Sequence, residues 1–334
     1  MEPVRLGIIG CGIAARELHW PALEKMADRF RIAVVCNHSE PKAKSFAGLV
    51  GGVPYVLDYH EVLARGDVDA VSIILPFGLN RRVTEEAASA GKHVMLEKPI
   101  AATLDDALEL VRLEKKTDVR LIVAENFRYR QLYSRTAEII AKGTVGNVYA
   151  VIWNFFTNVT SAANIQYLNT RWRLDDATYP GGFIIDGGVH ITAAIHDLFG
   201  EIATVSARTA CINPDAGKID TMLTDFTTRS GVAGTINMLY SSKGLRANSL
   251  HIFGDKGTLV VDSYGDSITT FIPESAPKTE IVDKEHGYTG EYENFFRAIR
   301  FGEPVVSTLE KAYRDYLVLV KAIEAGKTGT TITL

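Results

Sequence analysis

Four side chains that can carry chemistry lie within the stretch DGGVHITAAIHD, residues 186–197. They are Asp186, His190, His196 and Asp197. Three interpretations compete: a metal site, the acid/base groups of an enzyme, or the solvent-facing side of a helix. In a helix, Asp186 and His190 are four residues apart and share one face.

His196 follows His190 by six residues, a rotation of about 600° in a helix, so the two imidazoles point in different directions. This spacing disfavours a compact metal site, and we expect no metal. A histidine titrates near neutral pH and can accept the proton of an alcohol while hydride leaves its carbon. The spacing therefore places Asp186 on the same helical face as His190, the candidate proton acceptor, and favours a structural role for His196.

A second candidate is the tripeptide Glu97-Lys98-Pro99 in the stretch HVMLEKPIA. It follows an apolar run typical of a parallel strand, and open α/β sheets bind ligands at the carboxyl ends of their strands. A lysine there can stabilise a developing alkoxide, and its positive charge can lower the pKa of a nearby histidine. The alternative is a surface Lys98 paired with Glu97.

The stretch LGIIGCGIAARELH places Gly10, Gly12 and Ala15 in G-x-G-x-x-A spacing between a strand and a helix. Glycines permit a tight turn, and backbone N–H groups at a helix N-terminus bind pyrophosphate. The alternative is an ordinary glycine turn. The position after an N-terminal strand favours a dinucleotide cofactor.

The cofactor type depends on the end of the second strand, where an acid usually binds the ribose 2′-hydroxyl of NAD. In VVCNHSEPKAKS this position is Asn37, followed by His38, and Lys42 lies one turn further. None of these residues repels a 2′-phosphate, which favours NADP(H) over NAD(H). A site that accepts both cofactors is the alternative.

The elements that position these residues follow from hydrophobic periodicity. Apolar runs at 4–9, 31–36, 70–75, 93–97 and 120–125 alternate with helical patterns at 14–26, 40–50, 60–66, 79–91 and 103–118. This alternation predicts an α/β fold with a doubly wound parallel sheet. A helix at 131–142, a long strand at 147–156, β-like runs over 201–272 and a helix at 306–325 predict a second, α+β domain with a large, mostly antiparallel open sheet. We expect domains at 1–124 and 125–334.

Composition narrows the class of protein. The chain has 334 residues, 23% of them charged, and a net charge of −4, which argues against a nucleic-acid partner. It begins without a basic flank and long apolar core, and has no apolar run of about 20 residues, so we expect a cytoplasmic protein with no membrane partner. The three cysteines are expected to be reduced thiols.

Together, GIIGCGIAA, LEKPIA and GGFIIDGGVHITAAIHDLFG resemble the glucose-fructose oxidoreductase, inositol dehydrogenase and MocA (Gfo/Idh/MocA) family of NAD(P)-dependent enzymes. The resemblance covers essentially the whole chain and extends to AENFRY at the start of the second domain, and NFRYRQLY and YLNTRWR look closest to members that use NADP(H). It implies a Rossmann domain, a substrate-binding and oligomerisation domain, and a catalytic set of Lys98, Asp186 and His190. One departure lies at LPFGLNRR, where Leu75 and Asn80 replace the family's threonine and histidine.

With this resemblance, we expect oxidation or reduction of a sugar, polyol or related small molecule. His190 is the expected proton acceptor, Lys98 holds the substrate oxygen, and Asp186 orients substrate or imidazole. Asp197 is a further candidate for the pocket. The expected substrate contacts are Lys98, Arg128, Trp153, Asp186 and His190. The expected cofactor contacts are Gly10, Gly12, Ile13, Ala14, Ala15, Asn37, His38, Lys42, Pro76, Asn80, Glu97, Lys98, Asn126, Trp172 and Arg173.

Two alternatives stay open at this point. Some members of the family are NAD(P)-binding regulators or sensors without turnover, although they typically lose the lysine or the histidine. Others cleave glycosidic bonds by transient oxidation with a bound nicotinamide. A homodimer or homotetramer formed through the C-terminal sheet is also expected from the resemblance.

Overall fold

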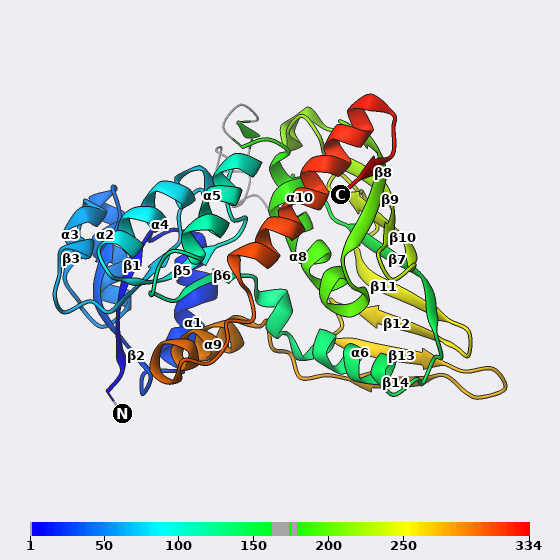
Figure 1. The fold of residues 1–334 in the computed structure, drawn as a ribbon, viewed down its shortest axis with the longest axis horizontal. Coiled ribbons are helices and arrows are strands. Elements are labelled where there is room, and N and C mark those ends of the chain that lie inside the picture. Colours follow the sequence, from blue (N-terminus) through cyan, green and yellow to red (C-terminus); the bar gives the residue numbers. More distant parts are fainter. Residues whose placement is uncertain (1, 162–173, 176–178) are drawn as a thin grey trace. The chain divides into compact units, whose positions relative to one another are not determined.

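The computed structural model describes residues 2–161, 174–175 and 179–334. The chain forms two compact units, shown in Figure 1. Unit 1 comprises residues 1–126 and 286–313, and unit 2 comprises 127–285 and 314–334. The first unit therefore includes a segment from near the C-terminus. The boundary between independently folding domains near residue 125 stays a prediction.

Unit 1 contains a six-stranded parallel sheet, which confirms the predicted doubly wound fold. Each of its central strands is a buried apolar run, as expected for a sheet covered on both faces. In spatial order the strands are β3 (Tyr55–Val56), β2 (Phe30–Cys36), β1 (Val4–Ile9), β4 (Ala70–Ile73), β5 (His93–Glu97) and β6 (Leu121–Ala124). The order reverses between β1 and β4, the place where such sheets bind dinucleotides.

Two helices of unit 1 begin at a residue whose side chain caps the first turn. Asp58 accepts a hydrogen bond from His60 N (3.0 Å), and Thr103 accepts one from Asp106 N (3.1 Å). The helices are α1 (Trp20–Glu24), α2 (Glu40–Leu49), α3 (Tyr59–Leu63), α4 (Asn80–Ser89), α5 (Leu104–Glu114) and α9 (Tyr288–Phe301), with a short 3₁₀ turn η2 (Phe77–Leu79). The sequence patterns above do not predict α9.

The segment 14–26 is not the single α-helix that its pattern predicts. The chain instead forms a π-helical turn, η1 (Ala15–His19), followed by α1. Pro21 lies in the first turn of α1 and lacks the N–H that a continuous α-helix would need at that position. The backbone stays helical from the π-turn into α1, and the side chain of His19 at the junction is 0% exposed.

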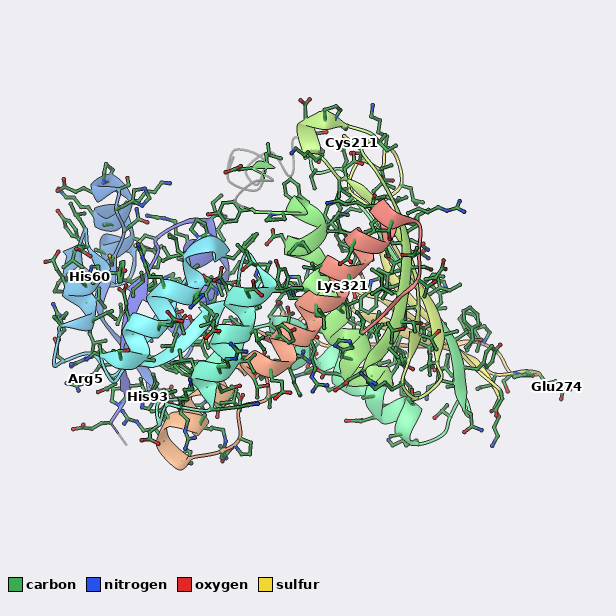
Figure 2. The ribbon with its side chains drawn as sticks, turned by 45° about the horizontal axis from the view of Figure 1, so that its top comes forward. Arg5, His60, His93, Cys211, Glu274 and Lys321 are labelled. Carbon is green, nitrogen blue, oxygen red and sulfur yellow. The ribbon has the colours of Figure 1, made fainter. Side chains whose placement is uncertain are left out.

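Polar side chains at the amino-terminal ends of the strands tie neighbouring strands together. Arg5 donates from its backbone N and from Nε to the carboxylate of Asp69, which precedes β4. His93 Nδ1 accepts from the backbone N of Arg120, which precedes β6. Figure 2 labels Arg5 and His93 at this end of the unit. These contacts are structural, and the opposite, carboxyl-terminal edge carries the candidate site.

Unit 2 is built on a nine-stranded sheet in which only β7 and β10 pair in parallel, which confirms the predicted, largely antiparallel architecture. Strand β9 shows the alternation of a sheet with one covered face, since Met222, Thr224 and Phe226 are buried between exposed neighbours. In spatial order the strands are β14 (Lys278–Ile281), β13 (Ser267–Phe271), β12 (Thr258–Asp262), β11 (Ala247–Gly254), β7 (Val148–Phe156), β10 (Ala233–Leu239), β9 (Thr221–Thr228), β8 (Ile202–Ala210) and β15 (Ile332–Thr333).

The helices that the sheet of unit 2 supports are α6 (Gln131–Ala141), α8 (Gly182–Phe199) and α10 (Leu309–Thr328), with 3₁₀ turns η3 (Asn126–Tyr129) and η5 (Pro214–Ala216). Helix α8 carries the histidine cluster. At Gly188 a β-carbon would lie 2.9 Å from Leu319 Cδ1 and 3.3 Å from Met238 Sδ. The glycine therefore lets α8 approach both α10 and β10 closely. Among the described residues, no helix is long and apolar enough to cross a membrane.

Candidate active site

The glycine motif forms a tight turn between β1 and the first helical turn. Gly10 has φ = +108°, and a β-carbon there would lie 2.0 Å from the carbonyl oxygen of Ile74. Only glycine fits this position. Ile13, Ala14 and Ala15 follow at the start of the first helical turns. The narrow turn fits the close approach that a pyrophosphate needs.

Asn37 connects this turn to the end of β2. Its Oδ1 accepts a hydrogen bond from Cys11 N (3.2 Å), and its Nδ2 donates to Ser39 O (3.3 Å). Asn37 occupies the position at which NAD-selective sites carry an acid, and its amide there holds the backbone of the glycine turn. His38 and Lys42 follow it and are exposed.

Arg16 is a basic residue beside this place that the sequence reasoning missed. Its Nη2 donates to Lys42 O at 3.5 Å, and its guanidinium lies 5.5 Å from the ring centre of Phe46 on α2. Its position one residue after the G-x-G-x-x-A motif is the signal that could have indicated it, because the helix that follows the motif runs beside the end of β2.

Lys98 directly follows β5 in a loop that is held from several sides. The peptide bond to Pro99 is cis. Asn80 Nδ2 donates to the carbonyl oxygens of Glu97 and Pro99, both at 2.9 Å. Asn80 itself is 0% exposed and begins α4. The residue that departs from the family pattern therefore binds the Glu97–Pro99 loop.

A buried polar chain fixes the side chain of Glu97. Its Oε1 lies 2.7 Å from His19 Nε2, and His19 Nδ1 lies 2.9 Å from the hydroxyl of Tyr292. That hydroxyl lies 3.1 Å from Ser72 Oγ. None of His19, Tyr292 and Ser72 was among the residues expected in the site. A histidine one helical turn after the glycine motif is the available signal, but its partner is 78 positions away.

The residues expected to contact the cofactor in unit 1 lie at or after the carboxyl ends of strands of the parallel sheet. Pro76 and Asn80 follow β4, Glu97 ends β5 and Lys98 follows it, and Asn126 follows β6. Asn126 Nδ2 donates to His286 O. Since parallel strands end at one edge, the sheet brings these residues to the edge at which open α/β sheets bind ligands. Their contacts with a cofactor stay predictions.

In unit 2, Asp186 and His190 lie one turn apart on α8, as expected. The His190 imidazole stacks on the ring of Phe127, with centroids 4.7 Å apart and planes at 20°. The hydroxyl of Tyr240 approaches the same turn, since a β-carbon at Gly187 would lie 2.1 Å from it. Burial raises the pKa of Tyr240 well above its usual value, and the charge of Asp186 adds to the rise.

His196 and Asp197 belong to a separate ionic cluster at the end of α8. His196 Nδ1 lies 2.8 Å from Asp315 Oδ1 on α10, which agrees with the expected structural role. The guanidinium of Arg128 is hydrogen-bonded to both Asp197 and Asp315. Asp315 is 2% exposed. In this arrangement the buried guanidinium of Arg128 pairs with the buried carboxylate of Asp315 and the partly exposed carboxylate of Asp197. A contact of Arg128 or Asp197 with substrate stays a prediction.

Trp153 lies in the interior of unit 2. It is 0% exposed, and its Nε1 donates to Asn248 Oδ1 at 3.0 Å. Its ring lies 5.8 Å from that of Tyr133, which in turn stacks on Phe127. Trp153 therefore packs against the ring stack from within the core, and none of its surface is exposed to a substrate. Trp172 and Arg173 lie outside the described residues.

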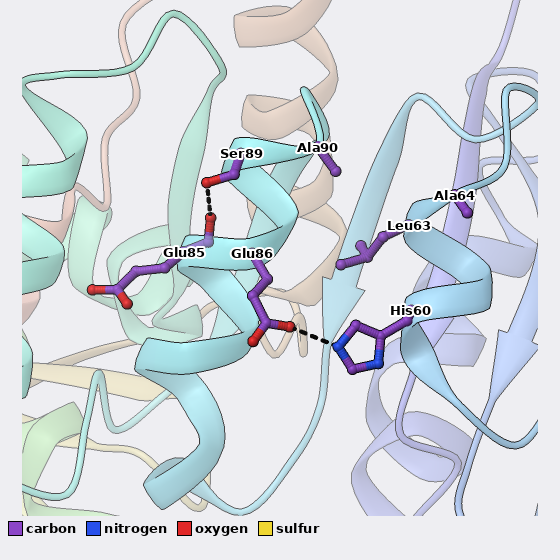
Figure 3. A pocket seen from close by; sticks show the side chains of 7 residues that line it. All are labelled: His60, Leu63, Ala64, Glu85, Glu86, Ser89 and Ala90. Carbon is purple, nitrogen blue, oxygen red and sulfur yellow. Dashed lines mark hydrogen bonds and ion pairs between the residues drawn. The ribbon is translucent and has the colours of Figure 1, made fainter.

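Outside the groups described so far, the features that bear on function are potential metal sites and pockets. Among the described residues, no cluster of three or more histidine, cysteine or carboxylate side chains could hold a metal ion. A shallow pocket between α3 and α4 contains none of the predicted residues (Figure 3). Its lining is His60, Leu63, Ala64, Glu85, Glu86, Ser89 and Ala90. His60 is already engaged there by Asp58 and Glu86.

Comparisons with known proteins agree with this geometry. The uncharacterized protein YMR315W of Saccharomyces cerevisiae is 35% identical over 268 residues, which cover 78% of this chain and 75% of the yeast protein. The crystal structure of an oxidoreductase (TM0312) from Thermotoga maritima has a TM-score of 0.92 and 32% identity, and covers 99% of this chain and 98% of its own. The WlbA dehydrogenase from Chromobacterium violaceum, in complex with NADH and UDP-GlcNAcA, has a TM-score of 0.87 and 25% identity over 100% of this chain and 96% of its own.

Family models cover both units. Residues 4–125 match the model described as "Oxidoreductase family, NAD-binding Rossmann fold". Residues 133–260 match the model described as "GFO/IDH/MocA C-terminal domain". These matches confirm the resemblance stated from the motifs. The chain belongs to the GFO/IDH/MocA family of oxidoreductases and carries its NAD-binding Rossmann domain.

Proposed function

We propose that the protein transfers hydride between NADP(H) and the hydroxyl or carbonyl carbon of a sugar, polyol or related small molecule. The observation that carries this proposal is the held Lys98 loop at the carboxyl edge of a sheet whose glycine turn fits a pyrophosphate. When bound, the nicotinamide supplies the hydride acceptor or donor. The described residues that act on the substrate are then a lysine, a carboxylate and an imidazole.

In the oxidation direction, His190 accepts the hydroxyl proton while Lys98 stabilises the negative charge on the oxygen. In the reduction direction, His190 returns the proton to that oxygen. Asp186 lies one turn before His190 on α8 and orients the imidazole or a substrate hydroxyl. A lysine in this role supplies the charge stabilisation that a metal ion supplies in other dehydrogenases.

The preference for NADP(H) rests on the end of β2. Asn37 bears no charge that would repel a 2′-phosphate, and its amide is already used by Cys11 N and Ser39 O. Arg16 adds a guanidinium beside Lys42, which provides the arginine that the motif at β2 itself lacks. The WlbA neighbour was solved with NADH, so a direct comparison of both cofactors is required.

The substrate class rests on the relatives. WlbA is named with the sugar nucleotide ligand UDP-GlcNAcA. We propose a sugar-like substrate on this basis, and a homodimer or homotetramer formed through the open face of the sheet of unit 2. Size-exclusion chromatography with light scattering measures the oligomeric state directly.

A fluorescence titration with NADPH and NADH, followed by a panel of carbonyl sugars and polyols with the tighter cofactor, tests the proposed function. We expect tighter binding of NADPH and cofactor consumption with a sugar carbonyl compound. Lys98→Ala and His190→Ala should each abolish turnover and leave the cofactor affinity nearly unchanged. Binding without any turnover would support a sensor, and glycoside cleavage with no net redox change would support a glycosidase.

A further inference from the structure

The side chain of Asn80 binds the backbone on both sides of Lys98. Its Nδ2 donates to the carbonyl oxygens of Glu97 and Pro99, each at 2.9 Å. An amide nitrogen has two hydrogens, so both are used in this clamp. Because both neighbours are acceptors, the orientation of the amide follows from its surroundings. The lysine therefore projects from a segment whose two flanking peptide groups are held by one side chain.

A second set of contacts holds the same segment through the side chain of Glu97. The carboxylate of Glu97 lies 2.7 Å from His19 Nε2, and His19 and Tyr292 are both 0% exposed. The hydroxyl of Tyr292 is 2.9 Å from His19 Nδ1 and 3.1 Å from Ser72 Oγ. Glu97 is thus fixed through its side chain by His19 and through its carbonyl by Asn80, which leaves little freedom at the base of the Lys98 side chain.

The burial of Asn80 is difficult to explain by packing alone. The side chain is 0% exposed, and among the residues that the structure describes its Oδ1 has no hydrogen-bond partner. A buried amide is unfavourable unless it is paired. Only the Nδ2 group of Asn80 forms hydrogen bonds among the described residues, and both of these bonds go to the segment that carries Lys98.

We propose that Asn80 is a positioning residue for Lys98, which keeps the ammonium group in reach of the substrate oxygen by fixing the two peptide groups that flank it. This inference rests on the proposed function, in which Lys98 contacts the substrate. Asn80 acts through Lys98, and this role replaces the direct cofactor contact expected from the sequence. It also gives the departure from the family's histidine a specific purpose in this chain.

Asn80→Asp is the sharpest test, because a carboxylate has the same shape as the amide but donates no hydrogen bond. We expect kcat to fall by about 10²-fold, the effect of displacing a catalytic group by about 1 Å. The affinity for NADPH should stay unchanged. The two carbonyls and burial raise the pKa of the new carboxyl group, and its protonated form again donates to one carbonyl. The ratio of variant to wild-type kcat should therefore rise as the pH is lowered.

A readout that needs no substrate complements the kinetics. Hydrogen exchange, followed by mass spectrometry on a peptide that covers residues 94–102, should be faster in Asn80→Asp than in the wild type. Asn294→Ala is the matched control, since Asn294 also holds a loop through Pro304 O (3.0 Å) and Val306 N (2.9 Å) but lies outside the proposed site. It should change neither kcat nor exchange over 94–102. If Asn80→Asp does not fold, Asn80→Ser carries the measurements of kcat, NADPH affinity and exchange, without the pH dependence, because a serine hydroxyl does not titrate in this range.

The outcomes separate this inference from the proposed function. If Lys98→Ala keeps its turnover, the proposed function is wrong. If Lys98→Ala is inactive but Asn80→Asp keeps wild-type kcat and exchange, the positioning role is wrong and the proposed function stands. Equal losses of kcat and NADPH affinity, with no pH-dependent recovery, would show that Asn80 contacts the cofactor and would also overturn the positioning role.

Discussion

The imidazole of His190 stacks on the phenyl ring of Phe127 with 4.7 Å between ring centroids and 20° between planes. Phe127 is held in turn by the ring of Tyr133 at 5.2 Å and the guanidinium of Arg130 at 5.2 Å. Arg130 is anchored by Asp266 Oδ1 at 2.7 Å. The orientation of the proposed proton acceptor thus depends on a chain of contacts within unit 2.

Phe127→Leu should lower kcat by roughly tenfold, because an aromatic pair contributes about 0.5–1.5 kcal/mol that a leucine does not replace. Phe127→Tyr keeps the ring and should restore kcat. Phe271→Leu, at an exposed phenylalanine of β13, is the control and should have no effect. A wild-type kcat in Phe127→Leu would contradict the role.

Gly187 and Tyr240 should be energetically coupled. A β-carbon at Gly187 would lie 2.1 Å from the Tyr240 hydroxyl, so Gly187→Ala should lower the free energy of unfolding by about 1–3 kcal/mol. Tyr240→Phe removes the hydroxyl and should relieve much of this loss in the double variant, as measured by urea unfolding. Among the described residues that hydroxyl has no hydrogen-bond partner, so Tyr240→Phe alone should not destabilise the protein.

Gly188→Ala provides the control for this cycle. A β-carbon at Gly188 would lie 2.9 Å from Leu319 and not beside Tyr240. Tyr240→Phe should therefore not restore the stability that Gly188→Ala loses. Additive effects for Gly187→Ala and Tyr240→Phe would show that the two residues are not in contact.

Arg16 and Lys42 should contribute to NADPH affinity more than to NADH affinity. Both lie beside the end of β2, where the 2′-phosphate distinguishes the two cofactors. Arg16→Gln and Lys42→Gln should each raise the Kd for NADPH by about tenfold, the loss of one hydrogen bond to a charged group. Lys44→Gln on the same helix should change neither Kd. An equal rise in the Kd values for NADPH and NADH would show that these side chains do not contact the 2′-phosphate.

Asp220 should make the stability of unit 2 depend on pH. Burial alone would raise the pKa of Asp220, but hydrogen bonds from Ser241 and from the backbone N of Ile212 (2.9 Å) and Asn213 (2.7 Å) outweigh burial and lower the pKa. A carboxyl group with a lowered folded-state pKa stabilises the protein above its unfolded pKa of about 3.9, and this contribution is lost as pH falls through the folded-state value.

Urea unfolding between pH 7 and pH 3 measures this effect, since these values lie on either side of the unfolded pKa of about 3.9. The free energy of unfolding should fall more steeply below pH 4 in the wild type than in Asp220→Asn, which should already be destabilised at pH 7. Asp225→Asn, at an exposed position of β9, should follow the wild type. Parallel curves for wild type and Asp220→Asn would show that Asp220 titrates alike in both states.

Thiol labelling should distinguish the three cysteines. Burial raises the pKa of both Cys11 and Cys36 to about 12, and Cys211 is exposed. Because the thiolate is the reactive form, iodoacetamide should label Cys211 in the folded protein and all three thiols in urea. Peptide mass spectrometry reads the sites. Rapid labelling of Cys11 without denaturant would show that the glycine turn opens.

Strand β1 illustrates how much of the fold is predictable from local pattern. The predicted run at 4–9 coincides with the observed Val4–Ile9, because a strand buried on both faces is a continuous apolar segment. The helix at 14–26 shows the limit, since the π-turn at Ala15–His19 depends on Pro21 and on the partner that buries His19. Helix α9 was beyond the periodic pattern as well, and it brings Tyr292 to His19 from 273 positions away.

The candidate site divides in the same way. The glycine turn, the Glu97-Lys98-Pro99 tripeptide and the pair Asp186 and His190 are recognisable because each is defined by residue types at short, fixed spacing. Trp153 was expected to face a substrate, but which side of a strand is covered depends on what packs there, and Trp153 is 0% exposed.

By itself, the amino-acid sequence determined the two sheet types, the dinucleotide-binding turn, the family and the residues that could react. The tertiary structure alone decided what holds those residues: Asn80 at the carbonyls beside Lys98, His19 at Glu97, and Phe127 at His190. The physical reason is that hydrogen bonds and ring contacts form between side chains that are distant in the chain, and local periodicity carries no information about which distant partner folding brings into reach.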